Sequence, residues 1–228
     1  MSKRPVVSFA DRIFLTGRLP YLWVILAVLI LYSGTMSFSF TYFDDDALII
    51  DNREFLSDPS NIFDSFSRRV FSDPHNSTPF YRPMLEVSLL LDAQIGGSGP
   101  FIYHFTNVAI HAIACCLLFL LLTKLGYSAW PSFLLSMTYA VHPALCQAIA
   151  WIPGRNDSLL TVFALASFVS LLNFLAGRKW KWCLFHQFFF FLALFTKESA
   201  IFIIPLSVLY IFLFERPKAV ESTEKLAP

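Results

Sequence analysis

Charged residues are scarce in this sequence. Asp, Glu, Lys and Arg make up 14% of its 228 residues, whereas an ordinary soluble domain carries about a quarter. Hydrophobic residues make up 56%, Phe alone occurs 26 times, and the mean hydropathy is +0.60. This balance excludes an ordinary soluble domain and places the chain among membrane proteins. The net charge is only +1, and no basic stretch interleaved with aromatic residues is present, so no nucleic-acid partner is predicted.

Cysteine is also scarce, and its positions form no motif. The 4 cysteines lie mostly inside apolar segments, and their spacing fits neither a metal site nor a disulfide framework. A helical repeat of about 34 residues, typical of tetratricopeptide arrays, is missing as well. Without a fixed-spacing metal motif, we predict no cofactor and no obligate metal ion.

Long apolar runs are abundant. A membrane-crossing helix needs roughly 20 apolar residues, and about six spans are predicted on that basis, at residues 21–40, 101–123, 130–148, 159–175, 180–195 and 200–214. The fifth is short, so we expect it to form a tight hairpin with the sixth. The first lacks a clear cleavage site and is interpreted as a signal anchor rather than a signal peptide. The predicted fold class is an all-α polytopic membrane bundle with a large first external loop.

The basic residues predict an orientation. If residues 1–20 form a cytoplasmic basic N-terminus, eleven Lys and Arg residues fall on the cytoplasmic side and six on the other, as the positive-inside rule requires. Residues 21–40 are then the first transmembrane helix, 41–100 an external catalytic-type loop, 101–214 the transmembrane bundle and 215–228 a cytoplasmic polar tail. The outer face is periplasmic or lumenal, so the membrane is a bacterial inner membrane or that of the endoplasmic reticulum.

The unusual polar residues gather on that outer face. They follow the first, third and fifth predicted spans, and they are Asp44, Asp45, Asp46, Tyr81, Arg82, His142, Arg155, Lys197 and Glu198. The cytoplasmic connections, by contrast, are short and merely basic. This one-sidedness predicts an active or binding site at the outer level of the membrane.

The aspartate trio allows more than one chemistry. Carboxylates close to one another can supply a general base, because one of them is pushed toward a useful pKa. They can equally bind a divalent cation through oxygen ligands. The plain structural interpretation is a solvated acidic flank at a helix end.

The outer-face cations suit a phosphate group. Arg82, Arg155 and Lys197 offer N–H donors, and arginine binds phosphate through a bidentate fork. Each has a structural alternative. Arg82 can anchor the chain near lipid headgroups, Arg155 can pair with Asp157, and Lys197 can pair with the neighbouring Glu198.

The second predicted span carries polar residues on one helical face. His104, Asn107 and His111 are spaced i, i+3 and i+7, which places them on the same side. Polar residues inside a bundle usually bond to neighbouring helices. For His104 a structural role and a site role are both open, whereas for the deeper His111 the structural role is favoured.

Several short motifs then occur in a fixed order. They are Phe43-Asp-Asp-Asp46, Ile50-Asp-Asn52, Tyr81-Arg-Pro83, His104-x-x-Asn107-x-x-x-His111, His142-Pro143, Trp151-x-x-Gly-Arg155-x-Asp157 and Lys197-Glu198. This string resembles the N-terminal membrane region of the transmembrane and tetratricopeptide-repeat O-mannosyltransferases and their bacterial relatives, which are GT-C type glycosyltransferases. Because such enzymes usually continue with more helices, the resemblance implies a truncated product, one subunit of a split enzyme, or a fragment.

The resemblance implies a membrane transferase that moves a hexose such as mannose. The donor would be a polyprenyl- or dolichyl-phosphate-linked sugar, taken from among the membrane lipids, and the acceptor a hydroxyl on a protein or glycan. Asp45 or Asp46 would be the catalytic base. The donor and its phosphate would be bound by Arg82, Tyr81, His142, Arg155, Lys197, Glu198 and His104. The alternative is an inactive GT-C remnant that binds lipid phosphate or scaffolds a second membrane subunit.

Overall fold

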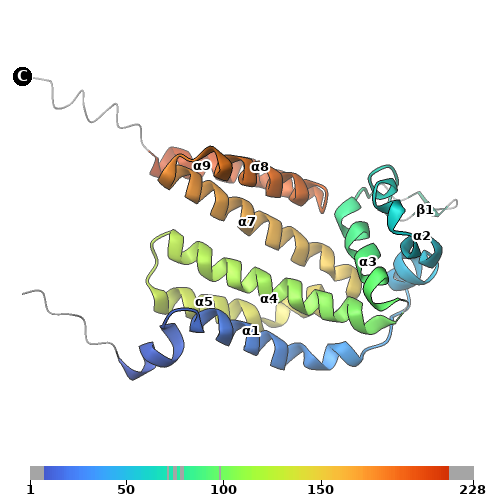
Figure 1. Cartoon of the computed structure of the whole chain (residues 1–228), viewed down its shortest axis with the longest axis horizontal. Helices are drawn as coiled ribbons and strands as arrows, with labels where there is room; N and C mark the ends of the chain where they lie inside the picture. Colours follow the sequence, from blue (N-terminus) through green and yellow to red (C-terminus); the bar gives the residue numbers. More distant parts are fainter. Residues whose placement is uncertain (1–7, 71, 74–75, 78–79, 98, 216–228) are drawn as a thin grey trace, which may run out of the picture.

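The computed structural model describes residues 8–70, 72–73, 76–77, 80–97 and 99–215, so the outer parts of both predicted terminal segments, 1–7 and 216–228, lie outside it. The described part of the chain is mostly helical (Figure 1). The longer helices are α1 (Leu19–Tyr32), α3 (Pro83–Gly96), α4 (Pro100–Lys124), α5 (Ala129–Val141), α7 (Arg155–Gly177), α8 (Trp180–Leu194) and α9 (Ile203–Phe214).

Short elements connect these helices. The helical ones are η1 (Asp11–Leu15), η2 (Ser33–Ser37), η3 (Asp46–Ile50), α2 (Arg53–Ser57), η4 (Pro59–Ile62), η5 (Asp64–Phe66), η6 (Pro143–Leu145), α6 (Cys146–Ala150), η7 (Ile152–Gly154) and η8 (Glu198–Phe202). Strands β1 (Ser72–Asp73) and β2 (Asn76–Ser77) form an antiparallel hairpin in which Ser72 pairs with Ser77.

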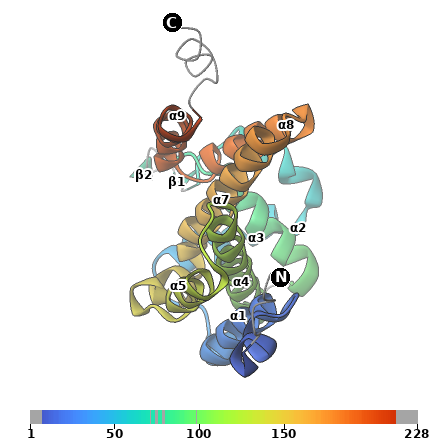
Figure 2. The ribbon, with the colours of Figure 1, turned by 90° about the vertical axis from the view of Figure 1, so that its left-hand side faces the viewer.

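Helix α4 lies at the centre of the bundle. It packs against α1, α5 and α7, and α7 in turn packs against α8 and α9. Figure 1 shows these helices running along the length of the molecule, and Figure 2 shows the same bundle from its end. The all-α membrane bundle predicted from the sequence is confirmed.

Fewer described helices qualify as membrane spans by length and composition than the six that the sequence predicts. Three described helices are long and apolar enough to cross a membrane, namely Leu19–Ser37, Pro100–Lys124 and Ile152–Gly177. Ala129–Val141 and Pro143–Ala150 add a fourth only if they form one span with a 50° bend. His142 is extended there, with ψ 124°, because proline disfavours a helical residue before it. Helix α8, at 15 residues, reaches only about 22 Å of a roughly 30 Å hydrocarbon core.

The segment predicted as a large external loop is a folded cap. Helices η3, α2 and α3 cover one end of the bundle (Figure 1). They enclose an apolar cluster that includes Leu48, Leu56 and Leu89, and this cluster continues into the bundle at Tyr103 and Ile152. The cap therefore shares a core with the membrane helices and is fixed relative to them.

One buried arginine joins the cap to the bundle. The Arg155 side chain is 0% exposed, and its Nη2 lies 2.6 Å from Oδ2 of Asp92 in α3. It also donates to Asn107 Oδ1 at 2.6 Å, to the Tyr103 carbonyl at 2.7 Å and to Ser88 Oγ at 3.3 Å. Helices α3, α4 and α7 thus meet at one guanidinium group.

A glycine allows this close approach. A Cβ atom at Gly154 would lie 2.5 Å from the Gln147 carbonyl oxygen and 2.9 Å from the Ala148 Cα. Both are backbone atoms, which cannot rotate away. The residue before Arg155 therefore has to lack a side chain for α6 and α7 to pack as they do.

Removing the arginine should destabilise the whole fold. Arg155→Met leaves the Asp92 carboxylate buried without its cation, and breaking one side of such a pair costs about 3–5 kcal/mol. We expect a large fall in the thermal unfolding temperature in detergent, partly recovered in Asp92→Asn/Arg155→Met because the second change removes the stranded charge. An Arg155→Met protein that unfolds within about 2 °C of the wild type would contradict this role.

Candidate functional site

The polar residues predicted on one face do lie at one end of the molecule. The cap, the start of α4, the start of α7 and the turn between α8 and η8 all meet there (Figure 1). Within this end the residues form two groups. One is centred on Asp45 and His104, the other on Arg82 and Lys197.

Asp45 is buried, and only one of its two carboxylate oxygens accepts hydrogen bonds. The residue is 1% exposed, and its Oδ2 accepts hydrogen bonds from the Thr41 backbone N–H at 2.7 Å and the Thr41 hydroxyl at 2.9 Å. Its Oδ1 is buried and has no hydrogen-bond partner among the described residues. One carboxylate oxygen is therefore fixed while the other keeps its lone pairs free.

His104 is the complementary neighbour. It is 2% exposed, its ring nitrogens form no hydrogen bond of good geometry among the described residues, and it interacts electrostatically with Asp45. Buried polar atoms are nearly always paired, so the unpaired Asp45 oxygen near the His104 ring indicates a place for a hydroxyl or similar ligand. The backbone of Ser39 and Ala150 also lies near the His104 ring, so the structural and the site interpretation of His104 both stay open.

The backbone before Asp45 is strained. Phe43 has φ 83°, a left-handed conformation that is uncommon for a bulky residue. Its side chain is 87% exposed, so packing of the ring does not explain the strain. The turn instead directs Asp45 inward, while Asp44 and Asp46 on either side stay half-buried.

The second group is a set of paired charges. Arg82 Nη2 lies 3.6 Å from Glu198 Oε1, and Lys197 pairs with Asp157. With its amide oriented to satisfy both neighbours, Asn156 accepts from Arg82 Nη1 at 2.9 Å and donates to the Thr196 carbonyl at 2.6 Å. The start of α3, the start of α7 and the α8–η8 turn are joined in this way.

These ion pairs are unequal in exposure. The Arg82 and Lys197 side chains are 17% and 27% exposed, whereas those of Glu198 and Asp157 are 67% and 57% exposed. The cations are held in place and the carboxylates face outward. An incoming phosphate can compete with the exposed carboxylates for both cations, because its oxygens accept the same charge-assisted hydrogen bonds.

The other predicted site residues have structural partners. Arg155 was expected either to bind phosphate or to pair with Asp157. Both expectations are corrected, because its N–H groups are buried on Asp92, Asn107, Ser88 and Tyr103. The Tyr81 hydroxyl donates to the Phe66 carbonyl at 2.8 Å. His142 is exposed, and its Nδ1 accepts from the Ala144 N–H at 3.2 Å, which caps η6.

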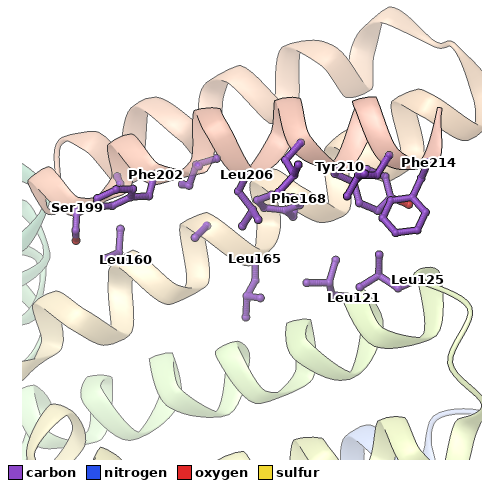
Figure 3. A pocket seen from close by; sticks show the side chains of 15 residues that line it. Leu121, Leu125, Leu160, Leu165, Phe168, Ser199, Phe202, Leu206, Tyr210 and Phe214 are labelled. Carbon is purple, nitrogen blue, oxygen red and sulfur yellow. The ribbon is translucent and has the colours of Figure 1, made fainter. Parts of the chain in front are cut away.

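An apolar groove begins beside the charged group. It has a volume of about 470 Å³ and is lined by residues of α4, α7 and α9. Figure 3 shows it running along α9 from Ser199, the residue after Glu198, to Phe214 and Leu125 at the far end. The groove thus leads from the level of Arg82 and Lys197 along α9 toward the opposite end of the bundle.

Two buried acids of the cap were missed from the sequence. Glu86 and Asp92 are each 3% exposed, and Glu86 Oε1 lies 2.9 Å from Arg68 Nη2. Burial raises the pKa of Glu86, and the charge of Arg68 only partly offsets this. Burial likewise raises the pKa of Asp92, against the opposing charge of Arg155. The sequence does contain a signal for these two residues, because they are the two carboxylates of the mainly apolar segment 83–96.

A metal site is not formed by these carboxylates. In the part of the chain that the structure describes, no three His, Cys, Asp or Glu side chains are grouped so that they could hold a metal ion.

The comparison with known families agrees with this arrangement. Residues 78–227 match the family described as "Dolichyl-phosphate-mannose-protein mannosyltransferase", and this segment covers more than half of the chain. The chain belongs to this family. The match takes in Arg82, His104, Arg155 and Lys197 and starts after the aspartate trio.

Individual relatives extend the likeness. The protein O-mannosyl-transferase TMTC2 of Homo sapiens is 31% identical over 200 residues, which is 83% of this chain and 24% of that protein. The protein O-mannosyl-transferase Tmtc1 of Drosophila melanogaster is 30% identical over 176 residues, 75% of this chain and 20% of that protein. The chain thus spans about a quarter of the length of these curated relatives. No solved structure matches it. The resemblance drawn from the ordered motifs is confirmed.

The buried acids of the cap should make this family member's stability depend on pH. Because the pKa of Glu86 is raised on folding, the folded state binds its proton more tightly. The contribution of Glu86 to stability therefore falls as pH rises from about 4.3, its unfolded value, through the raised pKa. In thermal unfolding between pH 4 and 8, Glu86→Gln should gain stability relative to the wild type as pH rises. The exposed Glu54→Gln is the control, and a difference that stays flat with pH would count against the prediction.

Proposed function

We propose that the chain is a membrane glycosyltransferase, or the part of one that holds its donor. It moves mannose from a dolichyl- or polyprenyl-phosphate carrier to a hydroxyl on a protein or glycan acceptor. The observation that carries the proposal is the buried Asp45 carboxylate, which has one oxygen without a hydrogen-bond partner among the described residues and lies near the buried His104. The donor and the reaction are suggested by the family description and by the relatives' name, protein O-mannosyl-transferase.

Asp45 is the base in this proposal. Thr41 holds Oδ2, so Oδ1 is the atom left to accept the proton of the acceptor hydroxyl. His104 adjoins the same position and can hydrogen-bond that hydroxyl, which fixes its direction of attack. Asp46, half-buried at the start of η3, is the second carboxylate at this position.

The transfer itself is a displacement at the anomeric carbon. The acceptor oxygen forms a bond to that carbon, its proton moves to Asp45, and the bond from the anomeric carbon to the phosphate oxygen breaks. The bonding electrons leave on the carrier phosphate. Arg82 and Lys197 stabilise that charge by exchanging Glu198 and Asp157 for phosphate oxygens.

The groove accounts for the rest of the donor. A polyprenyl chain is apolar throughout, and so is nearly all of the surface between α4, α7 and α9 below Ser199. If the polyprenyl chain lies in this groove and its phosphate binds Arg82, the attached sugar lies at the outer level of the membrane. Basic residues predict that this face is lumenal or periplasmic.

Loss of the base should abolish turnover without unfolding the protein. In membranes supplied with dolichyl-phosphate-mannose and an acceptor peptide, Asp45→Asn should lower kcat about a thousandfold, because an amide cannot accept the proton. Asp64→Asn, an exposed carboxylate of the same cap, should keep wild-type activity. Full activity in Asp45→Asn would rule out this base. A wild type that binds the donor lipid yet transfers nothing would instead support a lipid-phosphate-binding protein.

Loss of the cations should weaken donor use. Arg82→Gln and Lys197→Gln should each lower kcat/KM for the lipid-linked donor by about tenfold or more, because each removes a charged hydrogen bond to the leaving phosphate. Arg82→Lys should retain part of the activity, since it keeps the charge but not the fork. Lys181→Gln, an exposed cation at the start of α8, serves as the control. Equal donor kinetics in all four variants would contradict the phosphate site.

A further inference from the structure

Asn156 is a buried amide beside the two cations of the charged group. It is the second residue of α7 and is only 3% exposed, so its side chain is out of reach of a ligand. A carboxamide offers one acceptor oxygen and two N–H donors. Here the oxygen accepts from Arg82 Nη1 at 2.9 Å, and the nitrogen donates to the Thr196 carbonyl at 2.6 Å. Both polar atoms of the amide are therefore used within the protein.

The Arg82 guanidinium has one fixed and one exchangeable partner. Nη1 is held by the buried Asn156, whereas Nη2 lies 3.6 Å from Glu198, whose side chain is 67% exposed. The ring of Phe80 covers one face of the guanidinium, with its centroid 4.5 Å from Cζ. Because a guanidinium is planar and rigid, holding Nη1 and one face also fixes the direction of Nη2. Asn156 therefore keeps one N–H edge of Arg82 directed at the position that the exposed carboxylate occupies.

The other hydrogen bond of Asn156 acts on the second cation. Thr196 is 0% exposed and directly precedes Lys197 in the turn between α8 and η8. Its carbonyl, the group that Asn156 binds, is thus part of the peptide bond that leads into Lys197. Asp157, the next residue of α7, pairs with the Lys197 side chain itself. Arg82 and Lys197 are 115 positions apart in the sequence, and Asn156 joins the two segments that carry them.

We propose that Asn156 is a positioning residue, which holds Arg82 and Lys197 in the arrangement that lets them bind one lipid-linked phosphate together. The inference rests on the proposed function in taking these two cations as the phosphate site. Asn156 adds neither charge nor a contact to the ligand, so its effect runs through the orientation of the cations. Without it, the two long side chains lose more conformational freedom when the phosphate binds, and that ordering weakens binding.

Binding of the carrier lipid separates this role from catalysis. The full chain in detergent is titrated with dolichyl phosphate and with dolichol, which has the same apolar chain but no phosphate. Asn156→Ala should weaken dolichyl phosphate binding about tenfold, because a hydrogen bond that orients a charged group is lost, and should leave dolichol binding unchanged. Asn173→Ala is the matched control. Asn173 accepts from Lys124 at 2.6 Å near the other end of α7, and this variant should bind both lipids as the wild type does.

A double-mutant cycle identifies the residue through which Asn156 acts. In the Arg82→Gln background, Asn156→Ala should weaken dolichyl phosphate binding less than about threefold, because the guanidinium that it orients is gone. Asn156→Asp provides a second, nearly isosteric variant if the alanine variant does not fold. Its carboxylate still accepts from Arg82 but cannot donate to the Thr196 carbonyl, and its charge opposes that of the phosphate. It should therefore bind dolichyl phosphate at least tenfold more weakly than the wild type.

The possible failures are distinguishable. A wild type that binds dolichyl phosphate no better than dolichol would remove the phosphate site of the proposed function, and this inference with it. A wild type that prefers dolichyl phosphate, together with Asn156 variants that keep the full preference, would overturn the positioning role alone. Equal weakening of both lipids, or additive losses in the double variant, would reveal a purely structural role and overturn the positioning role as well.

Discussion

The ion pair between Arg155 and Asp92 is the constraint on which the rest of this structure depends. It is fully buried and joins the cap to the two longest helices, α4 and α7. A buried guanidinium is tolerated only when nearly all of its donors are satisfied. Meeting that requirement fixes the start of α7, and with it Asn156 and Asp157, which complete the charged group around Arg82 and Lys197. Arg155 is buried and out of reach of a ligand, yet it positions the group around Arg82 and Lys197, which a ligand can reach.

The two groups of the candidate site, around Asp45 and around Arg82 and Lys197, suit ligand groups of different charge. Around Asp45 the protein leaves an acceptor atom unpaired beside His104, which suits a hydroxyl that has to lose a proton. Around Arg82 and Lys197 it keeps cations paired with exposed carboxylates, which suits an anion that replaces them. Proton removal and leaving-group stabilisation are the two demands of glycosyl transfer from a phosphate.

Polar groups deep in the bundle follow a simple rule. His111 of α4 hydrogen-bonds to the Ala140 carbonyl of α5 at 3.1 Å, and Ser167 of α7 hydrogen-bonds to His186 of α8. These polar side chains thus find their partners on neighbouring helices. Water cannot satisfy such groups inside a membrane, which is why each needs a protein partner.

Composition and motif order were enough to predict an all-α membrane protein of this family, with Asp45, Arg82 and Lys197 at one end, because apolar length and local spacing are properties of the chain itself. The partners were not predictable. Arg155 has Asp157 two residues away yet pairs with Asp92, 63 positions earlier in the sequence, because helix packing buries the one and leaves the other exposed. The loop at 41–100 became a folded cap for the same reason. Burial decides which charges meet, and burial exists only in the tertiary structure.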